Sequence, residues 1–133
     1  MKPSFKKGFS IIELIFVIAV LGIIAAVAVP KLMDSRSSAL VTTIKQDIST
    51  ITSSIQSYQM INNKIERISD SVNINSNTWN VSDLKVEFIS EDKICVTIEV
   101  TEAKLNVLIY KDNSSLCQKL YDSGVREVSY GLY

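Results

Sequence analysis

The hydrophobic and polar residues follow three patterns along the chain, and the first is an almost unbroken apolar run at residues 9–29. Only Ser10 and Glu13 interrupt it. As an α-helix rising ~1.5 Å per residue, the run would be roughly 31 Å long, close to the hydrocarbon thickness of a bilayer. A chain of 133 residues could hardly surround so uniformly apolar a helix with a core of its own. The pattern therefore predicts a membrane-inserted helix.

A second pattern, beyond Pro30, predicts that the same helix continues with one apolar face. Apolar residues recur every three or four positions, namely Leu40, Ile44, Ile48, Ile51, Ile55 and Tyr58. We expect Pro30 to kink the helix and not necessarily to break it, because proline removes one backbone hydrogen bond and clashes with the preceding turn. Asn62 and Asn63 are expected to end the helix, since asparagine tolerates the left-handed cap conformation.

The third pattern is a period-two alternation of apolar and polar residues, which predicts β-strands at residues 84–88, 94–100 and 105–109. The apolar face of the first strand would be Leu84, Val86 and Phe88. Connections of hairpin length and one apolar face per strand indicate an antiparallel sheet packed on one side.

The polar residues on either side of these strands predict turns and one short helix. Residues 69–80 have the composition of a turn-rich connection. Ser114 and Ser115 are placed to cap a helix that reaches Tyr121, and a last strand is expected from Val125 to Tyr130.

Together the patterns predict an α+β fold, in which a long N-terminal helix packs its outer half on a small antiparallel sheet. The expected segments are a membrane helix at 9–30, its amphipathic continuation at 31–61 and a β-sheet head at 62–133. The charges before the run are all lysines, so the positive-inside rule places the N-terminus in the cytoplasm and the head outside it. The alternative is a secretory signal cleaved after the run, with small residues at Ala25, Ala26 and Ala28.

The two cysteines of the chain, Cys95 and Cys117, both fall in the part expected to be exported. Thiols of a small domain usually pair in an oxidising compartment, so a disulfide is expected. Two buried free thiols are the alternative.

The residues at 6–13, KKGFSIIE, followed by the apolar run, resemble the class III signal of type IV pilins and of the pseudopilins of type II secretion and competence systems. The resemblance implies that prepilin peptidase removes leader residues 1–8 by cleaving between Gly8 and Phe9, and then methylates the new amine of Phe9. Pro30 matches the helix-kinking proline of the family, and Gly22 matches a glycine in the segment where these helices loosen on assembly.

Glu13 is the residue for which the resemblance and the physical chemistry agree. A carboxylate at bilayer depth is unfavourable by a few kcal/mol unless it is paired or near the interface. Cleavage after Gly8 creates a positive amine at Phe9, and Glu13 of one subunit could pair with that amine on an adjacent subunit. Assembly would then relieve a penalty that exists in the monomer. The alternative is that Glu13 extends to the headgroups of an ordinary anchor.

The resemblance implies a structural subunit of a type IV pilus-like filament or of a pseudopilus for secretion or DNA uptake. Its expected partners are prepilin peptidase, other copies or related subunits, and an inner-membrane assembly platform with a cytoplasmic ATPase. The subunit would first be a single-pass inner-membrane protein with a periplasmic head, and later part of a filament in the periplasm or at the cell surface. The alternative function is a membrane-anchored periplasmic binding module that does not polymerise.

We expect no catalytic site and no cofactor. The chain has no histidine, and no nucleophile–base arrangement can be proposed from its residues. We also expect no metal site, although Glu91–Asp92 and Asp112–Asn113 are an alternative source of calcium ligands; turn-forming roles explain them better.

The charge of the mature chain argues against broad binding of nucleic acid. Loss of the three leader lysines leaves 11 of the 14 basic residues against 14 acidic residues, a net charge of −3. A local basic patch around Lys64 and Arg67 stays open as an alternative.

Overall fold

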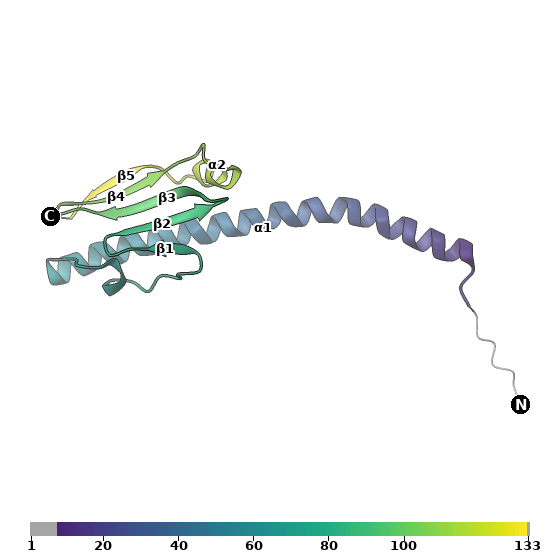
Figure 1. Ribbon diagram of the computed structural model, residues 1–133, viewed down its shortest axis with the longest axis horizontal. Coiled ribbons are helices and arrows are strands. Elements are labelled where there is room, and N and C mark those ends of the chain that lie inside the picture. Colours follow the sequence, from purple (N-terminus) through teal and green to yellow (C-terminus); the bar gives the residue numbers. More distant parts are fainter. Residues whose placement is uncertain (1–7, 133) are drawn as a thin grey trace, which may run out of the picture. The chain divides into compact units, whose positions relative to one another are not determined.

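A computed structural model describes residues 8–132, which form two compact units, one ending at Ser38 and the other beginning at Ala39. Helix α1 (Ile11–Asn62) contributes to both units, and all other elements lie in the second, which we call the head (Figure 1). The architecture is α+β, as the sequence predicts, with a long N-terminal helix and a five-stranded antiparallel sheet.

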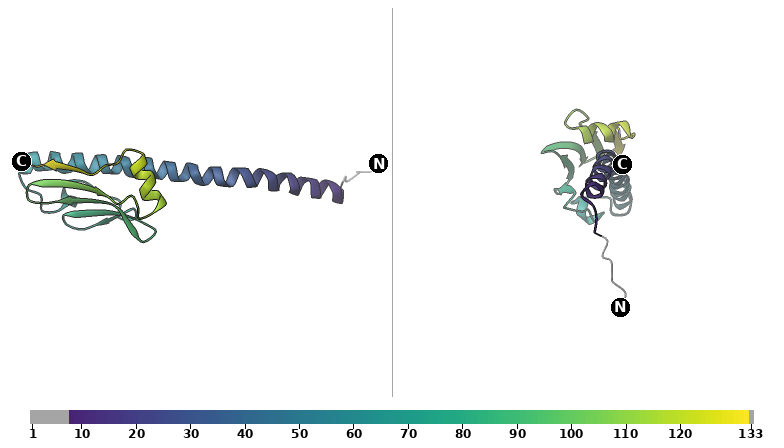
Figure 2. Two further views of the ribbon diagram at one scale, coloured as in Figure 1. Left: turned by 90° about the horizontal axis from the view of Figure 1, so that it is seen from above. Right: turned by 90° about the vertical axis from the view of Figure 1, so that its right-hand side faces the viewer.

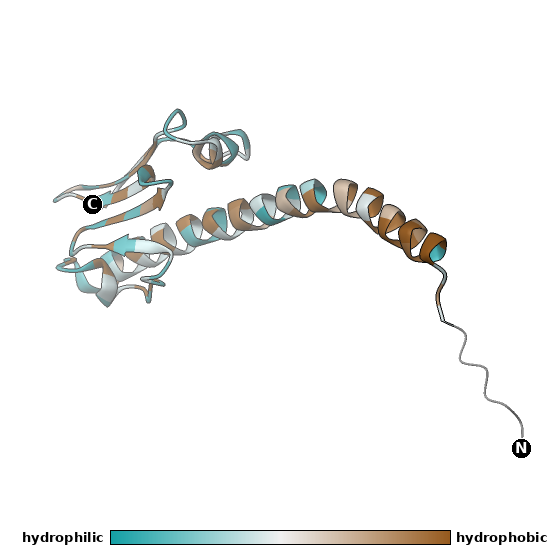
Figure 3. Cartoon of the chain, turned by 45° about the vertical axis from the view of Figure 1, so that its right-hand side comes forward, coloured by the Kyte–Doolittle hydropathy of each residue, from teal (hydrophilic) through white to brown (hydrophobic). Residues whose placement is uncertain are grey.

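Helix α1 runs for 52 residues and includes Pro30 without interruption. It ends where the sequence predicts, because Asn63 has a left-handed backbone with a φ of 58° and its N–H donates to the Gln59 carbonyl at 2.8 Å. This conformation satisfies one of the last carbonyls of the helix. Figure 3 shows the hydropathy of α1 changing from mostly apolar near its start to mixed in the head.

The head half of α1 buries one face, but not quite the face that the sequence predicts. Its buried residues are Val41, Ile44, Ile51, Thr52, Ile55 and Gln59. The prediction was wrong for Leu40, which is 39% exposed, whereas Ile48 and Tyr58 are half-buried. The centre of the buried face follows Val41 and Ile44, and Leu40 lies about 100° around the helix from Val41, on its flank.

The sheet is a simple antiparallel meander with the spatial order β1-β2-β3-β4-β5. Its strands are β1 (Trp79–Val81), β2 (Lys85–Ser90), β3 (Lys93–Val100), β4 (Lys104–Ile109) and β5 (Val128–Gly131). Figures 1 and 2 show these strands beside the head half of α1, with α2 (Ser115–Asp122) at one end of the sheet. The three strands predicted from alternation are confirmed to within about two residues, and β5 begins later than predicted.

Two local predictions in this region were wrong. Strand β1 lies at the end of the stretch expected to be turns, because Trp79 and Val81 pair with Phe88 and Val86 of β2. The polar residues around β1 hide it from a pattern search. Leu84 was placed on the apolar face of the first strand, but it precedes β2 and is 40% exposed.

Both faces of strand β3 are buried, although the sequence predicts a sheet packed on one side. Val96 and Ile98 are buried on one face, while Cys95 and Thr97, on the other face, are buried as well. Cys95 forms the predicted disulfide with Cys117 of α2, with 4.9 Å between their Cα atoms. The disulfide joins α2 to the central strand, and both half-cystines are fully buried.

Candidate functional site

The candidate site is the start of α1, where the expected processing junction meets the apolar run. Gly8, Phe9 and Ser10 precede the helix, and all three are exposed. A Cβ added at Gly8 would meet no atom within 4 Å, and Phe9 is 80% exposed. The Gly8–Phe9 peptide bond therefore lies in accessible, non-helical chain. Lys2, Lys6 and Lys7 of the expected leader fall outside the described residues.

Ser10 caps the helix, a role that the sequence analysis missed. Its side-chain oxygen accepts the backbone N–H of Glu13 at 3.2 Å, and its carbonyl accepts the N–H of Leu14 at 3.0 Å. A side-chain oxygen at this position satisfies one of the four N–H groups that have no partner inside a helix. The signal was present in the sequence as Ser-x-x-Glu, the pattern of a capping box.

Glu13 is the third residue of α1 and lies in its first turn. A carboxylate is favourable there because the N-terminal end of a helix carries a partial positive charge. This position lowers the free-energy penalty of placing a carboxylate in the apolar run, but it does not neutralise the charge. Within residues 8–132, no basic side chain forms an ion pair with Glu13.

The surface that follows Glu13 is entirely apolar and uncovered. No charged residue occurs between Glu13 and Lys31, and every residue from Gly8 to Arg36 is exposed. Among the described residues, α1 is the one helix that is long and apolar enough to cross a membrane. An apolar surface of this length needs either lipid or other protein around it, since water solvates it poorly.

Gly22 and Pro30 are both in regular helix in this structure. A Cβ at Gly22 would meet no atom within 4 Å, so packing inside the chain does not require glycine there. Pro30 has no N–H, which leaves the carbonyl of Ala26 without its usual helical donor. The loosening and kinking roles of these two residues stay predictions.

The sequence left a calcium site and a nucleic-acid site open as alternatives. Across the described part of the chain, no group of three or more potential ligands among His, Cys, Asp and Glu could hold a metal ion. The Asn113 amide donates to the Ile94 carbonyl at 2.7 Å, and this bond occupies one side chain of the proposed calcium set.

The basic patch around Lys64 and Arg67 is neutralised by neighbouring acids. Lys64 lies 2.8 Å from Glu66, and Arg67 lies 3.4 Å from Asp70. The pairing raises the pKa of Lys64 and lowers the pKa of Glu66, in each case chiefly through their hydrogen bond. Both residues are exposed, so these charges offer little net attraction to a phosphate backbone.

Comparison with known proteins supports the resemblance at the N-terminus. Residues 4–29 match the family described as the prokaryotic N-terminal methylation motif. Over 62 residues, the chain is 39% identical to type II secretion system core protein G of Pseudomonas aeruginosa. The aligned region covers 47% of this chain and 44% of that protein. The chain is 30% identical over 64 residues to the protein of the same name from Klebsiella michiganensis, covering 48% of this chain and 45% of that protein.

A fimbrial protein of Pseudomonas aeruginosa is 36% identical over 52 residues, which cover 39% of this chain and 34% of that protein. The chain thus spans less than half the length of these curated relatives. No solved structure is significantly similar to it. The prepilin-type motif and the similarity to pilin and pseudopilin proteins expected from the sequence are confirmed.

Proposed function

We propose that this chain is a subunit of a pilin-like filament, made as an inner-membrane precursor and polymerised through α1. The observation that carries the proposal is the placement of Glu13. It is the single charge in the exposed apolar run at residues 9–29, one turn beyond an exposed Gly8–Phe9 junction in a matched methylation motif. Prepilin peptidase would cleave that junction and methylate Phe9.

Before assembly, Glu13 is an unpaired carboxylate in a membrane segment. Insertion scales put such a charge at about 2.5–3.5 kcal/mol near the bilayer centre, and less toward the interface. The partial positive charge at the start of the helix offsets part of this penalty. A methylated amine at Phe9 of a neighbouring subunit keeps its positive charge and would offset much of the rest. Because amine and carboxylate lie at different positions on one copy, the contact is heterologous and leads to an open helical filament.

The second role of α1 follows from its uncovered apolar surface. In the membrane this surface contacts lipid, and in a filament the same surface would contact the α1 helices of neighbouring subunits. Extraction from lipid into a helix bundle exchanges one apolar environment for another, so the hydrophobic effect opposes it only weakly. A platform in the inner membrane and a cytoplasmic ATPase would then drive growth.

We place the filament in a type II secretion-like system rather than in a pilus. The match to core protein G of Pseudomonas aeruginosa is both longer and more identical than the match to the fimbrial protein, which supports this choice. The expected location is the inner membrane with a periplasmic head, followed by a filament in the periplasm.

The proposal is tested by the mass of the native protein and by the Glu13→Ala variant. We expect a mature chain that begins at Phe9 with one added methyl group. Glu13→Ala should be cleaved normally, while the yield of sheared filaments falls at least tenfold. Leu14→Ala is the matched control, since it shortens a neighbouring side chain without removing a charge. An intact Met1 in the native protein, or normal filament yield from Glu13→Ala, would contradict the proposal.

A further inference from the structure

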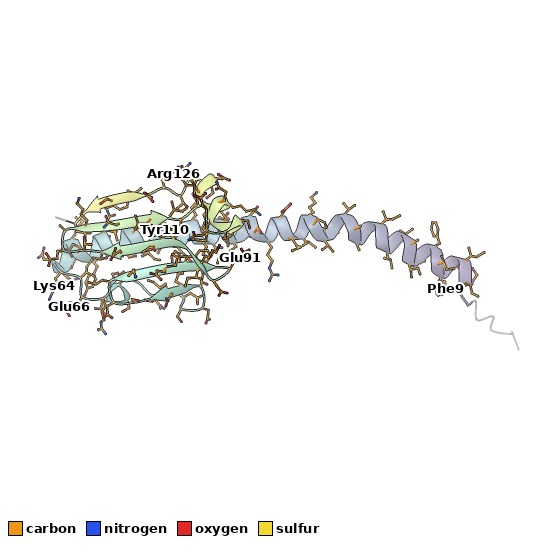
Figure 4. All side chains as sticks on the ribbon, turned by 45° about the horizontal axis from the view of Figure 1, so that its top comes forward. Phe9, Lys64, Glu66, Glu91, Tyr110 and Arg126 are labelled. Carbon is orange, nitrogen blue, oxygen red and sulfur yellow. A yellow bond between two sulfur atoms is a disulfide. The ribbon has the colours of Figure 1, made fainter. Side chains whose placement is uncertain are left out.

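The head contains a cleft of about 490 Å³ between two connections that adjoin α2, a volume typical of small-molecule sites. One wall is the segment after β4, with Tyr110 and Lys111, and the other is the segment after α2, with Arg126. Figure 4 shows Tyr110 and Arg126 at the same end of the sheet, far from Lys64 and Glu66 at the opposite end. The cleft lies entirely within the head, whose elements share one core.

Arg126 is held in position by the protein itself. Its guanidinium carbon lies 3.8 Å from the centre of the Tyr121 ring. Its Nη1 donates to the Val125 carbonyl at 3.0 Å and also to the Tyr121 carbonyl. These two bonds use both hydrogens of Nη1 and leave the N–H groups of Nε and Nη2 available. Nε and Nη2 form a fork that matches the two oxygens of a carboxylate, so this fork is oriented before any ligand arrives.

Lys111 brings a second positive charge to the same ring. Its ammonium lies 4.7 Å from the centre of the Tyr121 ring, a distance at which the ring attracts a cation. The ion pairs that residues 8–132 form include neither Lys111 nor Arg126. Both cations are therefore positioned by an aromatic ring and not by an acid.

The acidic residues of the cleft directly follow its cations in the sequence. Asp112 follows Lys111 on one wall, and Glu127 follows Arg126 on the other. Both carboxylates are exposed, and neither belongs to an ion pair of the described residues. Each wall thus presents one positive and one negative charge to the same space. Opposite charges that line one cleft without neutralising each other are complementary to a ligand that carries both signs.

We propose that this cleft binds a zwitterion of the amino-acid class, of dipeptide size or smaller. The Nε–Nη2 fork of Arg126 binds the carboxylate, with Lys111 on the same aromatic ring, and the carboxylates of Asp112 and Glu127 bind the ammonium group. Tyr110 is 41% exposed and adds an aromatic surface for the alkyl part of the ligand. The inference goes beyond the proposed function, because it assigns a small-molecule ligand to the head whether or not the chain polymerises.

A ligand that carries only negative charge fits this cleft less well. Asp112 and Glu127 would face a phosphate or a nucleic-acid backbone with like charge. The Glu91–Asp92 turn adds two exposed carboxylates at this end of the sheet, where the Tyr110 N–H donates to the Cys95 carbonyl at 2.8 Å. The acids of the cleft and of this turn therefore favour a ligand that also has a positive group.

The test is a titration of the full-length, isotope-labelled protein in detergent micelles with L-alanyl-L-alanine, followed by backbone amide chemical shifts. We expect a dissociation constant on the order of 1 mM for a ligand of this size in an open cleft. The largest shifts should occur in residues 110–113 and 126–127. N-acetylation removes the ammonium of the peptide, and amidation removes its carboxylate. Each change should weaken binding about two- to fivefold, the range expected for the loss of an exposed ion pair.

Variants of the protein test which side chain contacts which charge. Lys111→Gln should weaken binding of the dipeptide about two- to fivefold and leave binding of the amidated peptide unchanged. Glu127→Gln should weaken binding of the dipeptide similarly and leave binding of the acetylated peptide unchanged. Glu102→Gln and Lys104→Gln are matched controls, because both residues are exposed at the β3–β4 connection and should not alter affinity. Formation of the Cys95–Cys117 disulfide, seen as a gel shift on reduction, verifies that each variant folds.

Three results would overturn the inference. The first is the absence of shifts in the cleft residues at about 10 mM peptide. The second is equal affinity for the dipeptide and its acetylated form, which would mean that the carboxylate alone is recognised. The third is tighter binding of O-phosphoethanolamine than of the dipeptide, which would assign the cleft to a lipid headgroup. None of these measurements involves filament assembly, so their failure leaves the proposed function standing, and normal filament yield from Glu13→Ala leaves this inference standing.

Discussion

The Cys95–Cys117 disulfide should supply a large part of the stability of the head. It joins α2 to β3 across 22 residues of sequence. In the chain-entropy model, a cross-link of this span contributes about 3.4 kcal/mol by restricting the unfolded chain. Packing also holds α2, because Leu116 and Tyr121 lie against the core. Leu120 is buried, and the Lys45 ammonium donates to the Ser123 carbonyl at 2.7 Å, beyond the end of the helix.

The measurement compares oxidised and reduced forms of a fragment containing residues 39–133. All buried residues of the described chain lie between Val41 and Val125, so this fragment retains the whole core. Reduction keeps both sulfur atoms and therefore isolates the cross-link. We expect the free energy of unfolding in urea to fall by about 3 kcal/mol and the melting temperature to fall by roughly 12–24 °C.

The slope of the urea transition provides a second readout. It should be steeper for the reduced fragment, because a chain without the cross-link unfolds to a more exposed state. A difference of less than about 1 kcal/mol between the two forms would refute the reasoning, since α2 would then be held by packing and not by the cross-link.

Three further substitutions test single contacts. Asp47→Ala removes the acceptor of the buried Trp79 indole N–H, a bond of 3.0 Å, so urea unfolding followed by tryptophan fluorescence should show a loss of about 1–3 kcal/mol; an unchanged midpoint would contradict this. Ser10→Ala should weaken the first turn of α1 by about 1 kcal/mol. In micelles, the backbone amides of that turn should exchange faster in Ser10→Ala than in the Ser10→Thr control, and equal exchange rates would disprove the cap. Gly124→Ala places a side chain at φ 111° and should destabilise the head by at least about 1 kcal/mol in thermal unfolding; an equal melting temperature would argue against backbone strain there.

Most of the fold could be predicted from the sequence, because its main elements carry local signals. The apolar run and the helical spacing after it predict α1 over most of its length, and the left-handed asparagine after Asn62 marks its end. Ser114 caps α2 as expected, accepting the Cys117 N–H at 3.2 Å. These features depend on residues within one or two turns of each other.

The candidate site was proposed from the sequence on local signals of the same kind. Gly8, Phe9 and Glu13 form a contiguous motif, and the matched methylation motif spans them. The Ser10 cap was missed although Ser-x-x-Glu is a readable signal.

The local signals of the chain therefore predict the apolar helix with one charge at its start, the two cysteines available to pair, and the alternation that makes a sheet. Tertiary structure alone decided that β1 exists, that Cys95 lies on a second buried face, and that Lys111 and Arg126 meet over Tyr121. The physical reason is the distance along the chain over which each interaction acts. Periodicity, capping and turn formation join near neighbours, whereas an edge strand, a covered face or a charged cleft exists only when distant segments come together.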